Sequence, residues 1–399
     1  MTPAGAAPGA ADRVPRSHAQ TRTTLRFALL FIVLAAIAAT MSDARWLPLH
    51  LFLAGAIVLA ISGVSLMLTV TWSAAPAPPD GWVTCQRACI VLGAGGITLG
   101  RTLDLPVAFL AAAGTTFLVG LLLQAGLLTV TIRRGAKRRF DVAVVAYVLA
   151  LVLGAVGAAL GVVLATAASS TTARDAHVAA NLFGLVGLVV GGTMPFFAAT
   201  VGRSRMSPHA SARRLLLTTC FHAASLMLVL AALAVDATTL VGAGLAAYAV
   251  GIVLVLSSLP VVTRRQLQWA GPRLVALWLG GVWWAVAVIM TAVDVAHDHV
   301  VFGGRWLWVL VIAGYAQILW GSLAYLLPML RGGGPDRLSE GFATTRSWLG
   351  LAAVNATGIS LAVALPTAVT VSGLVVWLLD GAWRAGRVGT VPVPRSRPA

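Results

Sequence analysis

The sequence predicts an all-α fold, a polytopic membrane bundle of about 12 transmembrane helices with both termini in the cytoplasm. Hydrophobic residues make up 59% of the 399 residues and charged residues only 10%. Soluble domains are less apolar than this. The apolar residues form separate runs, each long enough to cross a hydrocarbon core about 30 Å thick. The basic residues fall mostly between these runs, as they do in multi-pass membrane proteins.

Each apolar run is predicted to be a helix, because a backbone surrounded by lipid must satisfy its own hydrogen bonds. The helix is the simplest structure that does this within one segment of the chain. The predicted spans are 24–42, 47–72, 83–101, 105–131, 141–169, 175–201, 213–235, 238–262, 273–294, 305–330, 344–364 and 366–386. The last two are separated by so few residues that they must form a tight hairpin.

The distribution of basic residues predicts the orientation. If the N-terminus is cytoplasmic, all but four of the 28 Lys and Arg residues lie on the cytoplasmic side. This is the asymmetry that the positive-inside rule describes. The net charge of +16 is therefore interpreted as a topology signal and as contacts with anionic lipids at the cytoplasmic loops, not as nucleic-acid binding. The predicted location is the plasma membrane.

The organisation expected is one transmembrane domain over residues 23–388. Residues 1–22 and 389–399 are rich in Pro, Ala and Arg, and we expect both to be disordered cytoplasmic tails. The three cysteines lie in or beside apolar runs and do not form a disulfide framework.

Two histidines indicate a site near the outer face. His50 and His177 each lie a few residues from the predicted outer end of their span, so they are expected at similar depth. Imidazole is the commonest metal ligand, and polar residues within spans are functional candidates. Asn181 and Gln317 lie on glycine-rich faces of the sixth and tenth spans and are the other predicted cofactor-binding residues. The alternative is that these polar groups only join helices to one another.

A second predicted metal site lies in the segment "DVAHDHV", expected to be an outer loop between the ninth and tenth spans. Its potential ligands are Asp294, His297 and His299. Imidazole combined with carboxylate suits Zn²⁺ or Cu²⁺. The alternative interpretation is a polar, solvated loop.

The layout and a few residues resemble the heme–copper superfamily and the related NnrS-like membrane proteins. In that superfamily an outer histidine on the second helix binds heme and a histidine on the sixth binds copper, the positions of His50 and His177. The NnrS-like pattern H-x-H-L-N-L-L-G is similar to "HVAANLFG" here, in which His177, Asn181 and Gly184 match. The stretch "GYAQILWGSLAYLLPMLRGGGP" also looks like the tenth helix of that branch.

The departures from the family limit what this resemblance implies. The oxidases carry a histidine pair on the seventh helix and an H-x-H on the tenth, and this chain has neither. The resemblance therefore implies a partial site that binds heme or copper, with a role in nitrogen-oxide or copper metabolism, and not a complete oxidase.

Two other functions remain open from the sequence. Twelve helices with both ends inside is also the layout of many secondary transporters. The chain is alternatively a structural or assembly subunit for an extracytoplasmic copper redox protein. Familiar catalytic motifs such as a P-loop or HExxH are missing, so the sequence does not decide whether the protein is an enzyme.

Overall fold

The structure is a computed structural model that describes residues 10–41, 45–167, 170–298 and 302–390. Every regular element in these ranges is a helix, which confirms the all-α prediction. The described residues form two compact units, and the single transmembrane domain over 23–388 stays a prediction. Unit 1 comprises residues up to Gly192 together with Leu215–Ala237, and unit 2 comprises Thr193–Arg214 and the chain from Thr238 onward.

Ten helices in the described ranges are long and apolar enough to cross a membrane, and each coincides with one of the first ten predicted spans. They are Arg13–Met41, Trp46–Ser73, Asp80–Thr102, Val107–Arg133, Asp141–Thr166, Thr171–Gly202, Ala212–Ala234, Thr238–Ser257, Pro272–His297 and Arg305–Arg331. The chain is therefore a multi-pass membrane protein by length and composition of its helices.

The last two predicted spans are present as helices α16 (Trp348–Ala362) and α17 (Thr367–Thr390). α16 has 15 residues, which is about 22 Å of helix and shorter than a hydrocarbon core. The turn between them is tight: Ala364 adopts a positive φ of 55°, and Pro366 precedes the first residue of α17. The hairpin was predicted, and the count of twelve membrane crossings stays a prediction.

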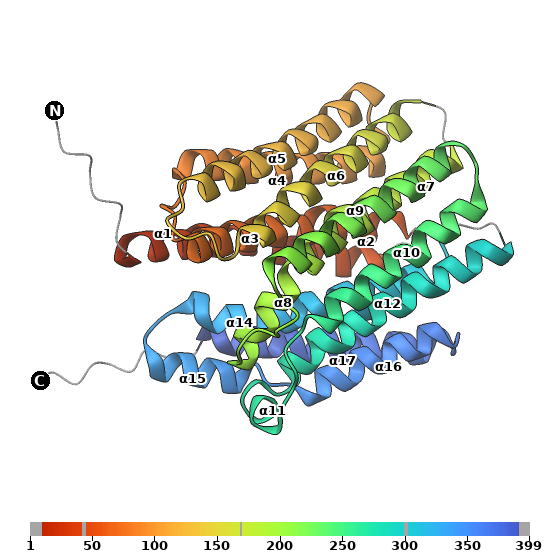
Figure 1. Cartoon of the computed structure of the whole chain (residues 1–399). Helices are drawn as coiled ribbons and strands as arrows, with labels where there is room; N and C mark the ends of the chain where they lie inside the picture. Colours follow the sequence, from red (N-terminus) through yellow and green to blue (C-terminus); the bar gives the residue numbers. More distant parts are fainter. Residues whose placement is uncertain (1–9, 42–44, 168–169, 299–301, 391–399) are drawn as a thin grey trace, which may run out of the picture. The chain divides into compact units, whose positions relative to one another are not determined.

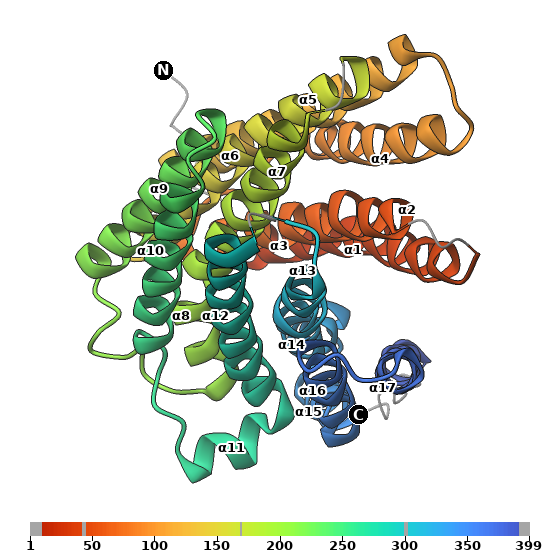
Figure 2. The ribbon, with the colours of Figure 1, turned by 90° about the vertical axis from the view of Figure 1, so that its right-hand side faces the viewer.

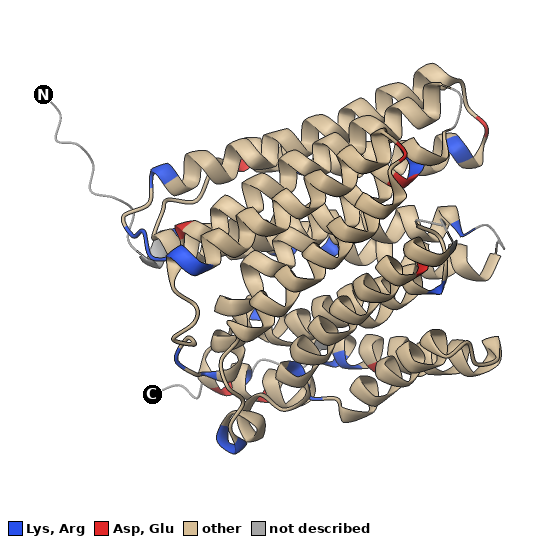
Figure 3. Ribbon diagram, turned by 45° about the vertical axis from the view of Figure 1, so that its right-hand side comes forward, with Lys and Arg blue, Asp and Glu red and all other residues tan. Residues whose placement is uncertain are grey.

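In unit 1, the helices lie side by side in sequence order. α4 (Asp80–Thr102) packs along α5 (Val107–Arg133), and α5 packs along α6 (Asp141–Thr166) (Figures 1 and 2). α1 (Ala10–Met41) packs on α3 (Val58–Ser73), which continues the second span. The charged residues gather mostly near helix ends, and long uncharged stretches lie between them (Figure 3).

A buried polar cluster joins α3, α4 and α5. The Gln124 amide donates to the Ser62 carbonyl at 2.9 Å and to the Ser65 hydroxyl at 3.2 Å. The Gln86 amide donates to the Ser62 hydroxyl at 3.2 Å and to the Gly120 carbonyl at 3.3 Å. All four side chains named here are buried. These contacts favour the interpretation of Gln124 as a group that joins helices.

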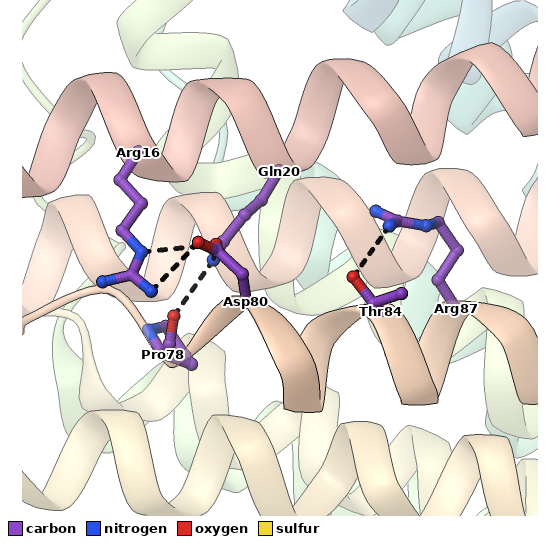
Figure 4. A network of polar contacts seen from close by, with 6 residues as sticks. All are labelled: Arg16, Gln20, Pro78, Asp80, Thr84 and Arg87. Atoms are coloured by element: carbon purple, nitrogen blue, oxygen red, sulfur yellow. Dashed lines mark hydrogen bonds and ion pairs between the residues drawn. The ribbon is translucent and has the colours of Figure 1, made fainter.

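The N-terminal segment is helical from Ala10, whereas we expected disorder up to residue 22. Polar contacts to the loop before α4 explain the difference (Figure 4). Arg16 forms an ion pair of 3.1 Å with Asp80, and the Gln20 amide donates to Asp80 and to the Pro78 carbonyl. Composition alone could not show this, because each partner lies about sixty residues away in the sequence.

In unit 2, aromatic side chains form the core between three helices. Trp284 of α12 (Pro272–Asp298) is fully buried, with Tyr248 of α10 (Thr238–Ser257) at 6.1 Å and Tyr315 at 6.0 Å between ring centres. Trp283 precedes Trp284 in the sequence, and its indole N–H donates to the Asn355 side-chain oxygen of α16 at 2.8 Å. Asn355 therefore also serves helix packing.

Three spans contain a π-helical segment within the described residues, and they are the second, sixth and tenth predicted spans. The segments are η1 (Leu51–Ile57), η2 (Ala180–Gly187) and η3 (Val309–Ala316). His50 directly precedes η1, Asn181 lies within η2, and Gln317 directly follows η3. π-Helical segments are rare and occur frequently at functional sites. These are the same three spans that the sequence selected for their polar residues.

The polar cluster generates a prediction about stability. Gln124→Leu removes two hydrogen bonds between helices, each worth about 0.6 kcal/mol and at most about 1.7 in a membrane protein. We expect the free energy of unfolding in detergent to fall by about 1–2 kcal/mol. The matched control is Thr116→Val on the same helix, since Thr116 is half-buried and bonds only to the Ala112 carbonyl of its own helix. Equal losses in the two variants would contradict the role given to Gln124.

Candidate functional site

His50 is the last residue of the short helix α2 (Trp46–His50), and its orientation is fixed locally. Its Nδ1 lies 2.9 Å from the Trp46 carbonyl oxygen. A carbonyl can only accept, so Nδ1 carries the hydrogen of this bond, and in the neutral ring Nε2 is left with the lone pair. The Trp46 ring lies against the imidazole, with 4.3 Å between ring centres, and the Arg101 guanidinium lies 5.9 Å from the Trp46 ring.

His177 belongs to α7 (Thr171–Ala179) and is held by the neighbouring helix α6. Its Nδ1 lies 2.8 Å from the Gly157 carbonyl oxygen. The same argument gives a ring with hydrogen on Nδ1 and the lone pair on Nε2. Metal-binding histidines are commonly held in this way, by a bond from the second ring nitrogen to a backbone carbonyl or a carboxylate.

The two imidazoles lie together, as their matched depth predicted. Their ring centres are 6.2 Å apart and their planes differ by 11°. Neither Nε2 has a hydrogen-bond partner among the described residues. Two imidazoles on opposite sides of one ion, each with its nitrogen at about 2.0–2.1 Å, have ring centres on the order of 6 Å apart, because each centre lies roughly 1 Å beyond its nitrogen. The separation of the pair is therefore compatible with a shared metal ion.

Two glycines of α6 make room for these side chains. A Cβ on Gly157 would lie 2.4 Å from the Asn181 amide nitrogen, and a Cβ on Gly161 would lie 2.9 Å from Cε1 of His177. No real side chain tolerates either distance without a shift of its neighbour. Glycine at these positions lets the helix of His177 approach the α6 backbone closely enough for the bond to the Gly157 carbonyl.

Asn181 contacts His177 rather than standing apart from it. Its amide donates to the His177 carbonyl at 2.8 Å and lies 3.4 Å from the His177 Nδ1. Asn181 is therefore placed to position the imidazole and its helix. Gln317 lies in unit 2, is buried, and donates to the Ala276 carbonyl of α12 at 3.3 Å. That contact joins helices, and the cofactor role predicted for Gln317 stays a prediction.

The second predicted metal site differs from expectation in its secondary structure. Residues 294–298 were expected in a loop, but α12 continues to Asp298, so Asp294 and His297 lie one turn apart on a helix. His297 is exposed, and its Nδ1 bonds to the Val293 carbonyl at 2.8 Å. His299 lies outside the described residues, and the proposed three-residue site depends on it.

The donor set available to a metal is small. No group of three His, Cys, Asp or Glu side chains within the described ranges could hold a metal ion. The histidine pair therefore offers two nitrogens and no protein-derived third ligand there. Such a set suits a metal that needs only two ligands from the protein, as copper(I) or the iron of a heme does.

Sequence reasoning missed the residues that hold the pair in place. Gly157 and Gly161 are part of a glycine repeat in "LGAVGAALG", which is a recognisable signal of close helix packing. The partner of that packing could not be identified from the sequence. The contacts of Trp46 and Arg101 near His50 likewise require the fold.

No protein-family model matches the chain, and no curated protein matches it. The geometry of the site is thus the basis for a functional proposal.

The close approach at Gly157 generates a prediction. Gly157→Ala forces Asn181 or the helix of His177 to move, and overpacking of this kind costs about 1–3 kcal/mol. We expect a lower midpoint of thermal unfolding in detergent. The control is Gly126→Ala, because nothing lies within 4 Å of a Cβ there and alanine favours a helix. An unchanged midpoint in Gly157→Ala would show that the contact between Gly157 and Asn181 has room for a methyl group, against this account.

Proposed function

We propose that the protein is a multi-pass plasma-membrane protein in which His50 and His177 bind one metal centre, a copper ion or a heme iron. The observation that carries this proposal is the pairing of the two imidazoles at 6.2 Å, each with Nδ1 held by a backbone carbonyl. Helix packing would use only the Nδ1 bonds, whereas a metal centre would also use the two Nε2 atoms that have no hydrogen bond to the protein.

Neighbouring groups of the chain would orient the two imidazole rings toward the metal and fix which ring nitrogen carries hydrogen. The Trp46 and Gly157 carbonyls hold both rings with Nε2 as the lone-pair nitrogen, and Asn181 braces the helix of His177. Copper and heme iron supply one-electron redox chemistry when bound. The roles that fit are electron exchange or metal handling in copper or nitrogen-oxide metabolism, with an extracytoplasmic copper redox protein as the partner class. The missing family histidines argue against complete oxygen reduction.

The proposal predicts a bound metal or heme that depends on both histidines. Protein purified in mild detergent is expected to hold about one equivalent of copper or of heme iron per chain, measured by elemental analysis and an optical spectrum. His50→Ala and His177→Ala are each expected to weaken binding by more than tenfold, because removal even of groups that only orient ligands has an effect of that size.

The controls separate loss of ligand from loss of fold. His209→Ala and His18→Ala remove imidazoles that belong to neither predicted metal site and should retain the bound metal. Helical circular dichroism of every variant should match that of the wild type. Wild-type protein that binds neither copper, after incubation with copper(I), nor heme would overturn the proposal, as would equal metal loss in all four variants.

The twelve-span topology is part of the proposal and has its own test. In a chain with Cys85, Cys89 and Cys220 replaced by Ser, Val363→Cys lies in the α16–α17 turn and is expected to face the outside. A membrane-impermeant thiol reagent should label it in intact cells. Ser339→Cys, in the predicted cytoplasmic segment, should be labelled only after permeabilisation. If both cysteines require permeabilisation, α16 and α17 do not cross the membrane.

A further inference from the structure

Three arginines gather in unit 2, away from the histidine pair. Arg203 follows the end of α8 (Leu188–Gly202), Arg273 lies at the start of α12, and Arg346 lies between α15 (Pro335–Thr344) and α16. The three meet at Trp269: the Arg203 guanidinium lies over its ring, and those of Arg273 and Arg346 approach its carbonyl. Each of the three lies at or next to the end of a helix. We call Arg203, Arg273 and Arg346 the arginine cluster.

The central member of the arginine cluster is buried and incompletely bonded. Arg273 is 2% exposed. Its Nε donates to the Ala270 carbonyl at 3.1 Å and its Nη2 approaches the Trp269 carbonyl at 3.4 Å, but its buried Nη1 has no partner among the described residues. A buried donor without a partner costs free energy, more so on a charged group. Arg203 and Arg346 are exposed, so the cluster is open to solvent on their side.

Aromatic rings form one wall of the cluster and add a second unpartnered donor. The Arg203 guanidinium lies 3.3 Å from the centre of the Trp269 ring, and the Arg273 guanidinium lies 4.7 Å from that of Phe342. The buried indole N–H of Trp269 has no partner in the described part of the chain. The arginine cluster and the adjacent Trp269 thus contain two buried donors without an acceptor, Arg273 Nη1 and Trp269 Nε1.

The positive charge of the cluster is not balanced by carboxylates. None of the ion pairs between described residues involves Arg203, Arg273 or Arg346. The acceptors present are backbone carbonyls at the end of α11 (Arg264–Ala270): Arg346 bonds to those of Gln268 and Trp269, and Arg273 bonds as described. The end of so short a helix carries at most about half a unit of negative charge, against three positive charges.

We propose that the arginine cluster, with Trp269, binds the phosphate group of an anionic ligand. Guanidinium groups match the oxygens of a phosphate in charge and in geometry. A phosphate also has enough oxygens to accept hydrogen bonds from both free donors, Arg273 Nη1 and Trp269 Nε1. The source is either the headgroup of an anionic phospholipid or a free phosphate. The site lies in unit 2 and contains none of the proposed metal ligands, so it does not depend on the proposed metal centre.

The test compares two sources of phosphate on the full-length protein. Inorganic phosphate is titrated against the detergent-solubilised protein, with sodium chloride at matched ionic strength as the anion control, and the midpoint of thermal unfolding is recorded. In parallel, the protein is reconstituted into nanodiscs of phosphatidylcholine with or without phosphatidylglycerol, and retained phosphatidylglycerol is measured by native mass spectrometry after extraction.

Three variants decide the outcome. Arg203→Gln removes an exposed charge of the cluster, and Trp269→Phe keeps an aromatic ring but removes the indole donor. Each is expected to weaken binding about tenfold or more, the loss expected for one hydrogen bond to a charged group. Arg205→Gln is the matched control, because it removes an equally exposed charge two residues from Arg203.

The pattern of losses identifies the ligand or overturns the proposal. Phosphate-dependent stabilisation that is lost in the first two variants and kept in Arg205→Gln supports a free phosphate. Retention of phosphatidylglycerol that is lost in Arg203→Gln and Trp269→Phe but kept in Arg205→Gln supports a lipid headgroup. Binding of neither probe by the wild type, or an equal loss in Arg205→Gln, would show that the arginines only cap α11.

Discussion

A polar side chain inside a bilayer has no water to bond with, so its partner must come from the protein. This constraint decides how each polar group of the chain is used. Gln86 and Gln124 bond to serines and carbonyls of neighbouring helices, and their amide donors are used for packing. His50 and His177 also bond to carbonyls, but only through Nδ1. Each histidine thus keeps its Nε2 without a hydrogen bond to the protein, which is the nitrogen that the proposed metal centre would use.

The membrane helices were predictable because hydrophobicity and length are local properties of the sequence. The pairing of His50 with His177 was also predictable, since the alternation of helix direction fixes depth. The 2.9 Å ion pair between Asp380 and Arg384 is local in the same sense, because its members lie four residues apart on one helix. What local patterns could not show were partners distant in sequence, such as the Gly157 carbonyl of His177 or the Asp80 carboxylate of Arg16.

The π-helical segments show a different limit of sequence reasoning. A π-helical turn holds one residue more than an α-helical turn, and this small difference is not apparent from hydrophobic periodicity in a uniformly apolar span. The segments nevertheless adjoin His50, Asn181 and Gln317, the residues selected for polarity. The arginine cluster was also hidden, because its members come from three separate segments of the sequence, and each basic residue alone indicates only topology.

The proposed site depends on two backbone carbonyls that hold His50 and His177 through Nδ1 and leave Nε2 of each ring without a hydrogen. The most direct test is ¹⁵N NMR of the ring nitrogens in protein labelled at histidine, with each resonance assigned by its loss in a single-histidine variant. In metal-free protein at neutral pH, both residues should show a protonated Nδ1 and an unprotonated Nε2. Hydrogen on Nε2, or on both nitrogens of either ring, would contradict the account.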